Sequence, residues 1–300
     1  MAREKKVVGP NDFKWVRSIY GKGPEASQRY HHIPDGGMND IIKEWHDKQE
    51  DGFRAWASPS QLTACPRVVW LQNNDVPVFN TMTWAVKQRL LLGRLFENQF
   101  ATELDDAGKL VYHWKDNPGV EVDKFQFGEG VAKFTGVPDY IIKTEVDGDE
   151  VVAVSDAKTS RSDSFGYVPI ELNEAAKEGS FKKYKIQVDG YYKLCIENPE
   201  FFEKNKLPLP THCHLFSYAL DDGVVRREFT WKPTQHDLAK VEQLARRFNL
   251  ALSAESMPEC TCQEEDDNYQ MKFCPYGVVE PGSKVAESCC DPGLANQVES

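Results

Sequence analysis

Hydrophobic positions recur at two different spacings along the chain. Over residues 83–107 they return every three or four residues, which places them on one side of an α-helix. The same spacing predicts helices over residues 171–197 and 233–253, and Ser58-Pro59 marks the start of another helix. Short apolar or alternating runs between turn residues predict strands. These strands cover residues 111–113, 120–127, 131–134, 140–145, 151–155, 212–219 and 224–231.

The order of these elements predicts the fold class. A helix, a set of antiparallel strands, a second helix, a hairpin and a last helix favour an α/β (α+β) fold with a sheet flanked by helices. Residues 1–57 form a polar N-terminal extension with one short helical stretch, and residues 58–256 form the core. Residues 257–300 form an irregular C-terminal segment that is rich in cysteine and acidic residues. We therefore expect one main domain with an extension at each end.

Composition narrows the class of protein. The chain has 300 residues, 40% of them hydrophobic, which is enough to bury a core. The formal net charge of −11 argues against a protein that coats nucleic acid by bulk charge, although a local basic groove remains compatible with it. No apolar run approaches the roughly 20 residues of a membrane span, and the N-terminus has no secretory signal. We expect a cytoplasmic protein with no membrane partner, or one in the host cytoplasm if it is phage-encoded.

Two aspartates mark the ends of neighbouring predicted strands. Asp139 precedes the strand at 140–145, and Asp156 follows the strand at 151–155, with a turn between the strands. The two carboxylates should therefore meet, and they repel each other unless they share a cation such as Mg²⁺ or Mn²⁺. Lys158 lies two residues from Asp156, on the same face of the strand, and adds a positive charge for a phosphate. The pattern predicts hydrolysis of a phosphodiester bond.

Three further residues extend this site. Glu97 lies among the apolar residues of the long helix and would complete the metal ligands. Gln187 and Tyr191 are one helical turn apart and follow a basic, aromatic segment, which suits contact with a phosphate backbone. Taken alone, each has an ordinary structural interpretation, namely a solvated helix position for Glu97 and a core side chain for Tyr191. The prediction therefore depends on the residues occurring together.

The order of these motifs resembles the PD-(D/E)XK nuclease superfamily, and within it the RecB-type exonucleases. The resemblance spans residues 58–192 and rests on Gly93–Glu97, Gly136–Asp139, Asp156–Lys158 and Gln187–Tyr191. It implies a restriction-endonuclease-like core with a mixed sheet, with Asp139 and Asp156 as metal ligands and Lys158 as the catalytic lysine. It also implies that Gln187 and Tyr191 support the site and contact DNA. Many RecB-type members carry histidine where this chain has Glu97, and others carry glutamate.

Five of the eight cysteines lie in the C-terminal segment, which indicates metal or redox chemistry. Cys65-Pro66-Arg67 is similar to a motif of RecB-like nucleases associated with CRISPR and of AddB-type helicase–nucleases. In those proteins one early cysteine and three late ones hold a [4Fe–4S] cluster. The resemblance implies Cys65, Cys260, Cys262 and Cys274 as ligands, with Cys289 or Cys290 able to replace Cys260 or Cys262. Four thiolates also bind Zn²⁺, and thiols without metal remain an alternative. Cys195 and Cys213 are predicted to be core thiols.

The main hypothesis is a metal-dependent deoxyribonuclease, an exonuclease in DNA recombination, repair or phage DNA processing. Its substrate would be single-stranded or end-bearing DNA, and a recombination or replication protein could be its partner. A DNA-binding scaffold or recombination partner on a nuclease fold is the alternative. A third interpretation is a structural-metal protein whose cysteine segment docks a partner.

Overall fold

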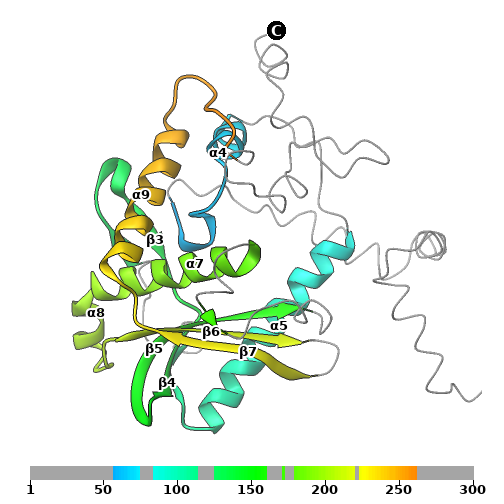
Figure 1. The fold of residues 1–300 in the computed structure, drawn as a ribbon, viewed down its shortest axis with the longest axis vertical. Helices are drawn as coiled ribbons and strands as arrows, with labels where there is room; N and C mark the ends of the chain where they lie inside the picture. The colour runs from blue at the N-terminus through cyan, green and yellow to red at the C-terminus, as the bar shows by residue number, and fades with distance from the viewer. Residues whose placement is uncertain are drawn as a thin grey trace, which may run out of the picture. The chain divides into compact units, whose positions relative to one another are not determined.

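A five-stranded mixed sheet lies between helices on both faces (Figure 1). The computed structural model describes residues 57–74, 84–113, 125–160, 171–172, 179–219 and 223–261. The strands of this sheet, in spatial order, are β1 (Leu110–His113), β4 (Tyr140–Val146), β5 (Asp149–Ser160), β6 (His212–Ala219) and β7 (Val224–Trp231). Only β5 and β6 are parallel, and the other neighbours are antiparallel. The predicted fold class, a mixed sheet flanked by helices, is confirmed.

The hairpin from β4 to β5 sets the register of the sheet. Asp147 and Gly148 form a two-residue turn with φ values of +53° and +90°. Such turns match the twist of the two strands, and Asp-Gly is a preferred pair for them. The hairpin pairs Tyr140 with Ser155. This register places Asp139 beside Asp156, at the end of the hairpin that lies away from the turn.

Two helices cover the two faces of the sheet. Helix α7 (Gly179–Ile196) packs on β5 and β6, and α5 (Trp84–Asp106) packs against β1 and β5 on the other face (Figure 1). Side chains of β5 alternate between these helices. Val154 belongs to the core on the α7 side, whereas Ala153 and Ala157 pack with Phe100 of α5. Asp156 and Lys158 consequently face α7.

Seven further elements complete the described fold. They are η3 (Pro59–Gln61), α4 (Pro66–Asn73), β2 (Phe125–Phe127), η4 (Gly130–Ala132), β3 (Phe134–Gly136), α8 (Pro199–Lys204) and α9 (Gln235–Leu252). The buried amide of Asn249 in α9 accepts a hydrogen bond from Ala57 N at 2.9 Å. It also donates to the carbonyls of Val131 and Lys133. One side chain thus connects α9 to two distant segments.

Two motif glycines have a packing role. A Cβ atom on Gly136 would lie 2.6 Å from Pro59 Cδ, and a Cβ on Gly190 would lie 3.1 Å from Leu62 Cδ1. The segment that contains η3 therefore fits between β3 and α7 because these two positions lack side chains. The same segment leads directly to Cys65.

Some element predictions need correction. The strand predicted at 131–134 is wrong, because Gly130 has a φ of +55° and opens the turn η4, so that β3 begins at Phe134. The helix predicted from Ser58 is interrupted, since Pro66 keeps Cys65 extended and separates η3 from α4. Helix α8 was not predicted, and β5 continues beyond the predicted 155 to Ser160.

Several other predictions lie outside the described residues. They include most of the N-terminal extension 1–57, the strand residues 120–124, and Cys262, Cys274, Cys289 and Cys290 of the C-terminal segment. Within the part of the chain that the structure describes, no helix combines the length and apolar character that crossing a membrane requires.

Candidate active site

An aspartate–lysine pair on β5 is the centre of the candidate site. Lys158 Nζ lies 2.6 Å from Asp156 Oδ2, and the Asp156 side chain has no exposed surface. Burial alone would lower the pKa of Lys158, but the charges of Asp156 and Asp139 outweigh it and raise the pKa. The lysine is therefore held as an ammonium ion. The 12-residue length of β5 carries both side chains to the end of the sheet, where β5 runs parallel to β6.

Asp139 brings a second carboxyl group to this centre. Burial raises its pKa well above the usual range, and the charges of Asp156 and Glu97 raise it further. The positive charge of Lys158 lowers the pKa of Asp139 but does not cancel these effects. The structure therefore brings Asp139, Asp156 and Lys158 together, with the charge of Glu97 close enough to act on Asp139.

Helix α7, which covers this face of the sheet, holds Asp156 in place. Gln187 Nε2 donates to Asp156 Oδ1 at 3.2 Å and to Tyr191 Oη at 3.4 Å. The ring of Tyr184, one turn before Gln187, lies under Lys158, with the ammonium 5.1 Å from the ring centroid. Gln187 thus fixes the carboxylate while Tyr184 contacts the lysine. Tyr184 was not predicted, although its spacing from Gln187 places it on the same helix face.

Helix α5 is held against the same end of the sheet. Tyr140 Oη donates a hydrogen bond to the carbonyl of Glu97 at 2.6 Å. A Cβ on Gly93, one turn earlier, would lie 3.3 Å from Thr159 Oγ1 of β5. The glycine permits a close approach of helix and strand, and the Tyr140 hydrogen bond fixes the backbone at Glu97. These two contacts fix the helix backbone that carries Glu97, whose side chain is half-buried.

A second buried network on α7 was missed in the sequence. Lys185 Nζ lies 2.7 Å from Asp189 Oδ2 and 2.8 Å from Asp237 Oδ1. Trp231 Nε1 donates to Asp189 Oδ1 at 2.8 Å. Asp189 lies inside the Gln187–Tyr191 motif, but it connects α7 to β7 and α9 rather than to Asp156. Lys185 and Asp189 are one helical turn apart, but no local pattern pointed to Asp237 and Trp231, because both lie more than 40 residues away.

The carboxyl groups of Asp139 and Asp156 are suitable ligands for a hard divalent cation. Mg²⁺ is commonly bound by one or two carboxylates together with waters and substrate phosphates. Asp139 and Asp156 offer such a pair, and a divalent charge would offset the burial and the like charges that raise the pKa of Asp139. Among the residues that the structure describes, no group of three or more His, Cys, Asp or Glu side chains is arranged to hold a metal ion. The charge of Glu97 acts on Asp139, and the role of Glu97 as a third ligand stays a prediction.

The cysteines predicted to hold a cluster are only partly described. Cys65 Sγ and Cys260 Sγ lie 3.9 Å apart, although 195 residues separate them in the sequence. Three side chains of α4 hold the backbone that precedes Cys260: Arg67 donates to Pro258 O, Trp70 to Ala254 O and Asn73 to Leu252 O, each at 2.9 Å. The structure therefore brings together one early and one late cysteine of the predicted set.

Two further cysteines and His214 lie in the core. Cys195 and Cys213 are fully buried, and burial raises the pKa of both thiols, as the prediction of core thiols requires. His214 of β6 is buried between Ser155 Oγ at 2.9 Å and Glu228 Oε1 at 3.0 Å. Neither ring nitrogen of His214 is directed to the aspartate pair.

Comparisons with known proteins give distant structural similarities. No protein-family model and no curated protein sequence matches the chain. The structure of SSO0001 aligns over 81% of this chain and 93% of its own, with 18% identity and a TM-score of 0.42. The exonuclease-like structure LHK-Exo, in complex with dAMP, aligns over 71% of this chain and 93% of its own, with 15% identity and a TM-score of 0.38. Because these values are low, the chemistry of the site is derived from its own residues.

Proposed function

We propose that this chain is a Mg²⁺- or Mn²⁺-dependent DNA exonuclease. The observation that carries the proposal is the Asp156–Lys158 pair on β5, with Asp139 beside it directly before β4 and Gln187 of α7 bonded to Asp156. Clustered carboxylates repel phosphate unless a cation is bound, so a groove that only binds DNA has no use for them. DNA as the substrate, the exonuclease mode and a role in recombination or repair rest on the resemblance of the ordered motifs.

Each residue would have a distinct role. A divalent cation held by Asp139 and Asp156 would supply Lewis-acid activation of the scissile phosphate. Lys158, kept charged by its aspartate neighbours, would stabilise negative charge that develops on the phosphate oxygens. Gln187 would keep Asp156 in place, and Tyr191 would orient Gln187. Glu97 would add negative charge that favours the cation.

Digestion of labelled DNA tests this function. Full-length protein is incubated with end-labelled linear single-stranded and double-stranded DNA and with circular single-stranded DNA, with Mg²⁺, with Mn²⁺ or with chelator. We expect cation-dependent loss of the linear substrates only. Lys158→Ala should lower the rate by about 10²–10³-fold, the usual effect of removing one preorganised charge from a transition state. Lys143→Ala is the matched control, since Lys143 is a surface lysine on β4 paired with Glu150.

Other results would contradict the proposal. Cleavage that survives in Lys158→Ala would remove this site from the reaction, and cleavage of the circular strand would show an endonuclease. Wild-type protein that binds DNA in a salt-dependent manner but never cleaves it would favour the scaffold alternative.

We further propose that Cys65 and Cys260 contribute to a metal centre with Cys262 and Cys274. The short distance between the two described sulfur atoms, and the three hydrogen bonds that hold the segment before Cys260, support a shared centre. Thiolates are suitable ligands for a [4Fe–4S] cluster and equally for Zn²⁺. The centre would connect the start of the core to the C-terminal segment.

Anaerobic purification and metal analysis test the cysteine proposal. A brown protein with broad visible absorption would indicate an iron–sulfur cluster, whereas a colourless protein with stoichiometric zinc would indicate the alternative. Cys65→Ala should lose the metal, and Cys195→Ala should retain it because Cys195 is a core thiol. Wild-type protein without iron or zinc would overturn the proposal.

A further inference from the structure

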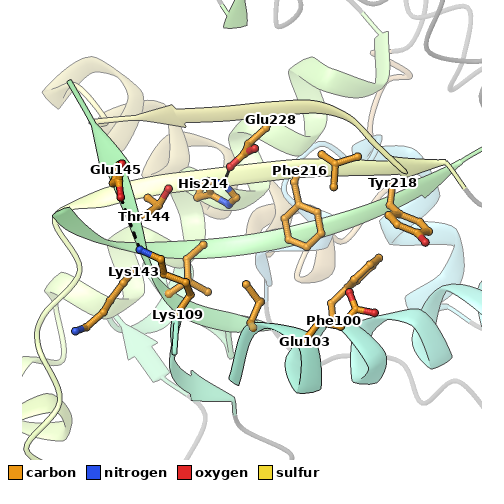
Figure 2. A pocket seen from close by; sticks show the side chains of 13 residues that line it. Phe100, Glu103, Lys109, Lys143, Thr144, Glu145, His214, Phe216, Tyr218 and Glu228 are labelled. Atoms are coloured by element: carbon orange, nitrogen blue, oxygen red, sulfur yellow. Dashed lines mark hydrogen bonds and ion pairs between the residues drawn. The ribbon is translucent and has the colours of Figure 1, made fainter. Parts of the chain in front are cut away.

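A pocket of about 500 Å³ lies on the face of the sheet opposite the candidate active site (Figure 2). Three aromatic rings line one end, where Phe100 of α5 contacts Phe216 and Tyr218 of β6 at centroid distances of 5.2 and 4.8 Å. Val225 of β7 completes this apolar end and is 48% exposed. Asp139, Asp156 and Lys158 do not line the pocket. The nuclease proposal therefore leaves this pocket without a role.

The charge around the pocket selects the kind of ligand. Glu228 of β7 lies at the upper edge beside His214, and Glu103 lies on α5 (Figure 2). The two lysines of the lining, Lys109 and Lys143, are at the other end and pair with acidic residues. Near the apolar end the charge is therefore negative. Such a pocket repels DNA and suits an apolar group with a basic neighbour.

The position of β7 suggests how a ligand would lie. β7 is the last strand of its sheet, and no other described strand pairs with its outer edge. Val224 and Val225 are both more than 40% exposed at its start. An exposed edge is a template for an added strand, and a pocket beside it can select one side chain of that strand. The edge of β7, its exposed valines and an apolar pocket with acidic neighbours thus lie together.

The register gives the expected spacing in a partner. Phe216 pairs with Glu228, and Tyr218 pairs with Val225. The register shifts between these two pairs, so β7 has one more residue than β6 over this stretch. Val225 and Glu228 therefore lie on the same face, two positions apart along the neighbouring strand. A strand added to β7 would meet these two groups with side chains at i and i+2.

We propose that β7 and this pocket bind an extended segment of a partner protein. The segment would place an apolar side chain against Tyr218 and Val225 and a lysine or arginine beside Glu228. The whole chain has a net charge of −11, so a basic segment of another protein is a better match than a second copy of this chain. The proposal is independent of the nuclease activity.

Selection of peptides tests this surface on the full-length protein. A displayed library of random linear peptides is selected against the wild-type chain, and the strongest peptide is synthesised with a fluorescent label. We expect an apolar and a basic residue two positions apart. Anisotropy titrations should show at least about tenfold weaker binding to Val225→Lys, which puts a charge at the apolar contact, and to Glu228→Lys, which reverses a charge contact. Val131→Lys and Glu203→Lys are matched controls, because both residues are exposed and lie outside the pocket.

Two further measurements distinguish the binding mode. A peptide whose basic residue is replaced by glutamate should regain affinity for Glu228→Lys. Bound wild-type peptide should slow amide hydrogen exchange in β7, as an added strand requires. Failure to select peptides, equal loss in the control variants, or unchanged exchange in β7 would overturn the proposal. Self-association of the chain that Val225→Lys abolishes would replace the partner with a second copy.

Discussion

Two lysine–aspartate pairs contact helix α7 and have almost the same geometry. Asp156–Lys158 are 2.6 Å apart, Asp189–Lys185 are 2.7 Å apart, and both aspartates are buried. The pairs differ in what surrounds them. Distance and burial alone therefore do not distinguish a catalytic pair from a structural one.

The Asp189 pair is satisfied by neighbouring donors. Trp231 donates to the second oxygen of Asp189, and Lys185 is shared with Asp237. Asp237 in turn accepts hydrogen bonds from Thr234, the N-cap of α9. Each carboxylate of this network thus has donors besides the lysine, which is the condition for a stable buried ion pair.

The Asp156 pair has an excess of carboxyl groups. Asp139 and Glu97 add to Asp156, and burial together with the charges of Asp156 and Glu97 raises the pKa of Asp139 in spite of Lys158. This cost is compensated only when a further cation binds, which is typical of sites that work with metals and phosphates. The two pairs therefore differ in the balance between hydrogen-bond donors and negative charges around each aspartate.

The largest expected effect is on stability at the structural pair. Asp189→Ala should lower the free energy of unfolding by about 3–5 kcal/mol, because Lys185 and Trp231 lose their buried hydrogen-bond acceptor. Asp156→Ala should change it by less than about 1 kcal/mol, since the repulsion with Asp139 disappears together with the lysine pair. Urea denaturation followed by tryptophan fluorescence measures both values.

For DNA cleavage, Asp156→Ala should have a larger effect than Asp189→Ala. Folded Asp189→Ala protein should retain most of the wild-type rate at low temperature, whereas Asp156→Ala should lose cleavage. If Asp156→Ala is as unstable as Asp189→Ala, the two pairs are both structural, and the comparison fails.

A smaller effect is expected at Asp139. Asp139→Asn should raise the stability of the metal-free protein at neutral pH by about 1 kcal/mol, because it removes a charge that burial and like charges disfavour. The same variant should lose the stabilisation that Mg²⁺ or Mn²⁺ gives to the wild type. Thermal unfolding with and without each cation measures both effects. A lower melting temperature without metal would mean that the carboxyl group of Asp139 is a structural hydrogen-bond partner.

Local patterns predicted the strands and the aspartate end of the site for a physical reason. The turn Asp147-Gly148 fixes the register of β4 and β5, so the positions of Asp139 and Asp156 follow from counting residues. The hairpin of β6 and β7 follows from the same kind of signal. The role of Gln187 relative to Asp156 also follows once α7 is placed on β5.

Contacts between distant segments could not be predicted in this way. Three such contacts depend on packing between elements: Lys185 with Asp237, Cys65 with Cys260, and Gly136 with Pro59. The pattern predicts a strand from Val131 because the apolar residues after Gly130 fit either a strand or a short helical turn. Metal content and substrate depend on molecules outside the chain, so they stay proposals.

The smallest expected effect is the pH dependence of the structural network. Hydrogen bonds from Lys185 and Thr234 outweigh the effect of burial and hold the pKa of Asp237 at about 2, below its ordinary value of 3.8. A lowered pKa in the folded state contributes stability above pH 4 that is lost as the pH falls towards 2. Because the Asp237 side chain is 25% exposed, we expect the wild type to exceed Asp237→Asn by about 1–2 kcal/mol at pH 6. The difference should be roughly halved at pH 3. Urea titrations of both proteins at the two pH values measure it, and a difference that stays constant with pH would show that Asp237 acts through its shape and not through its charge.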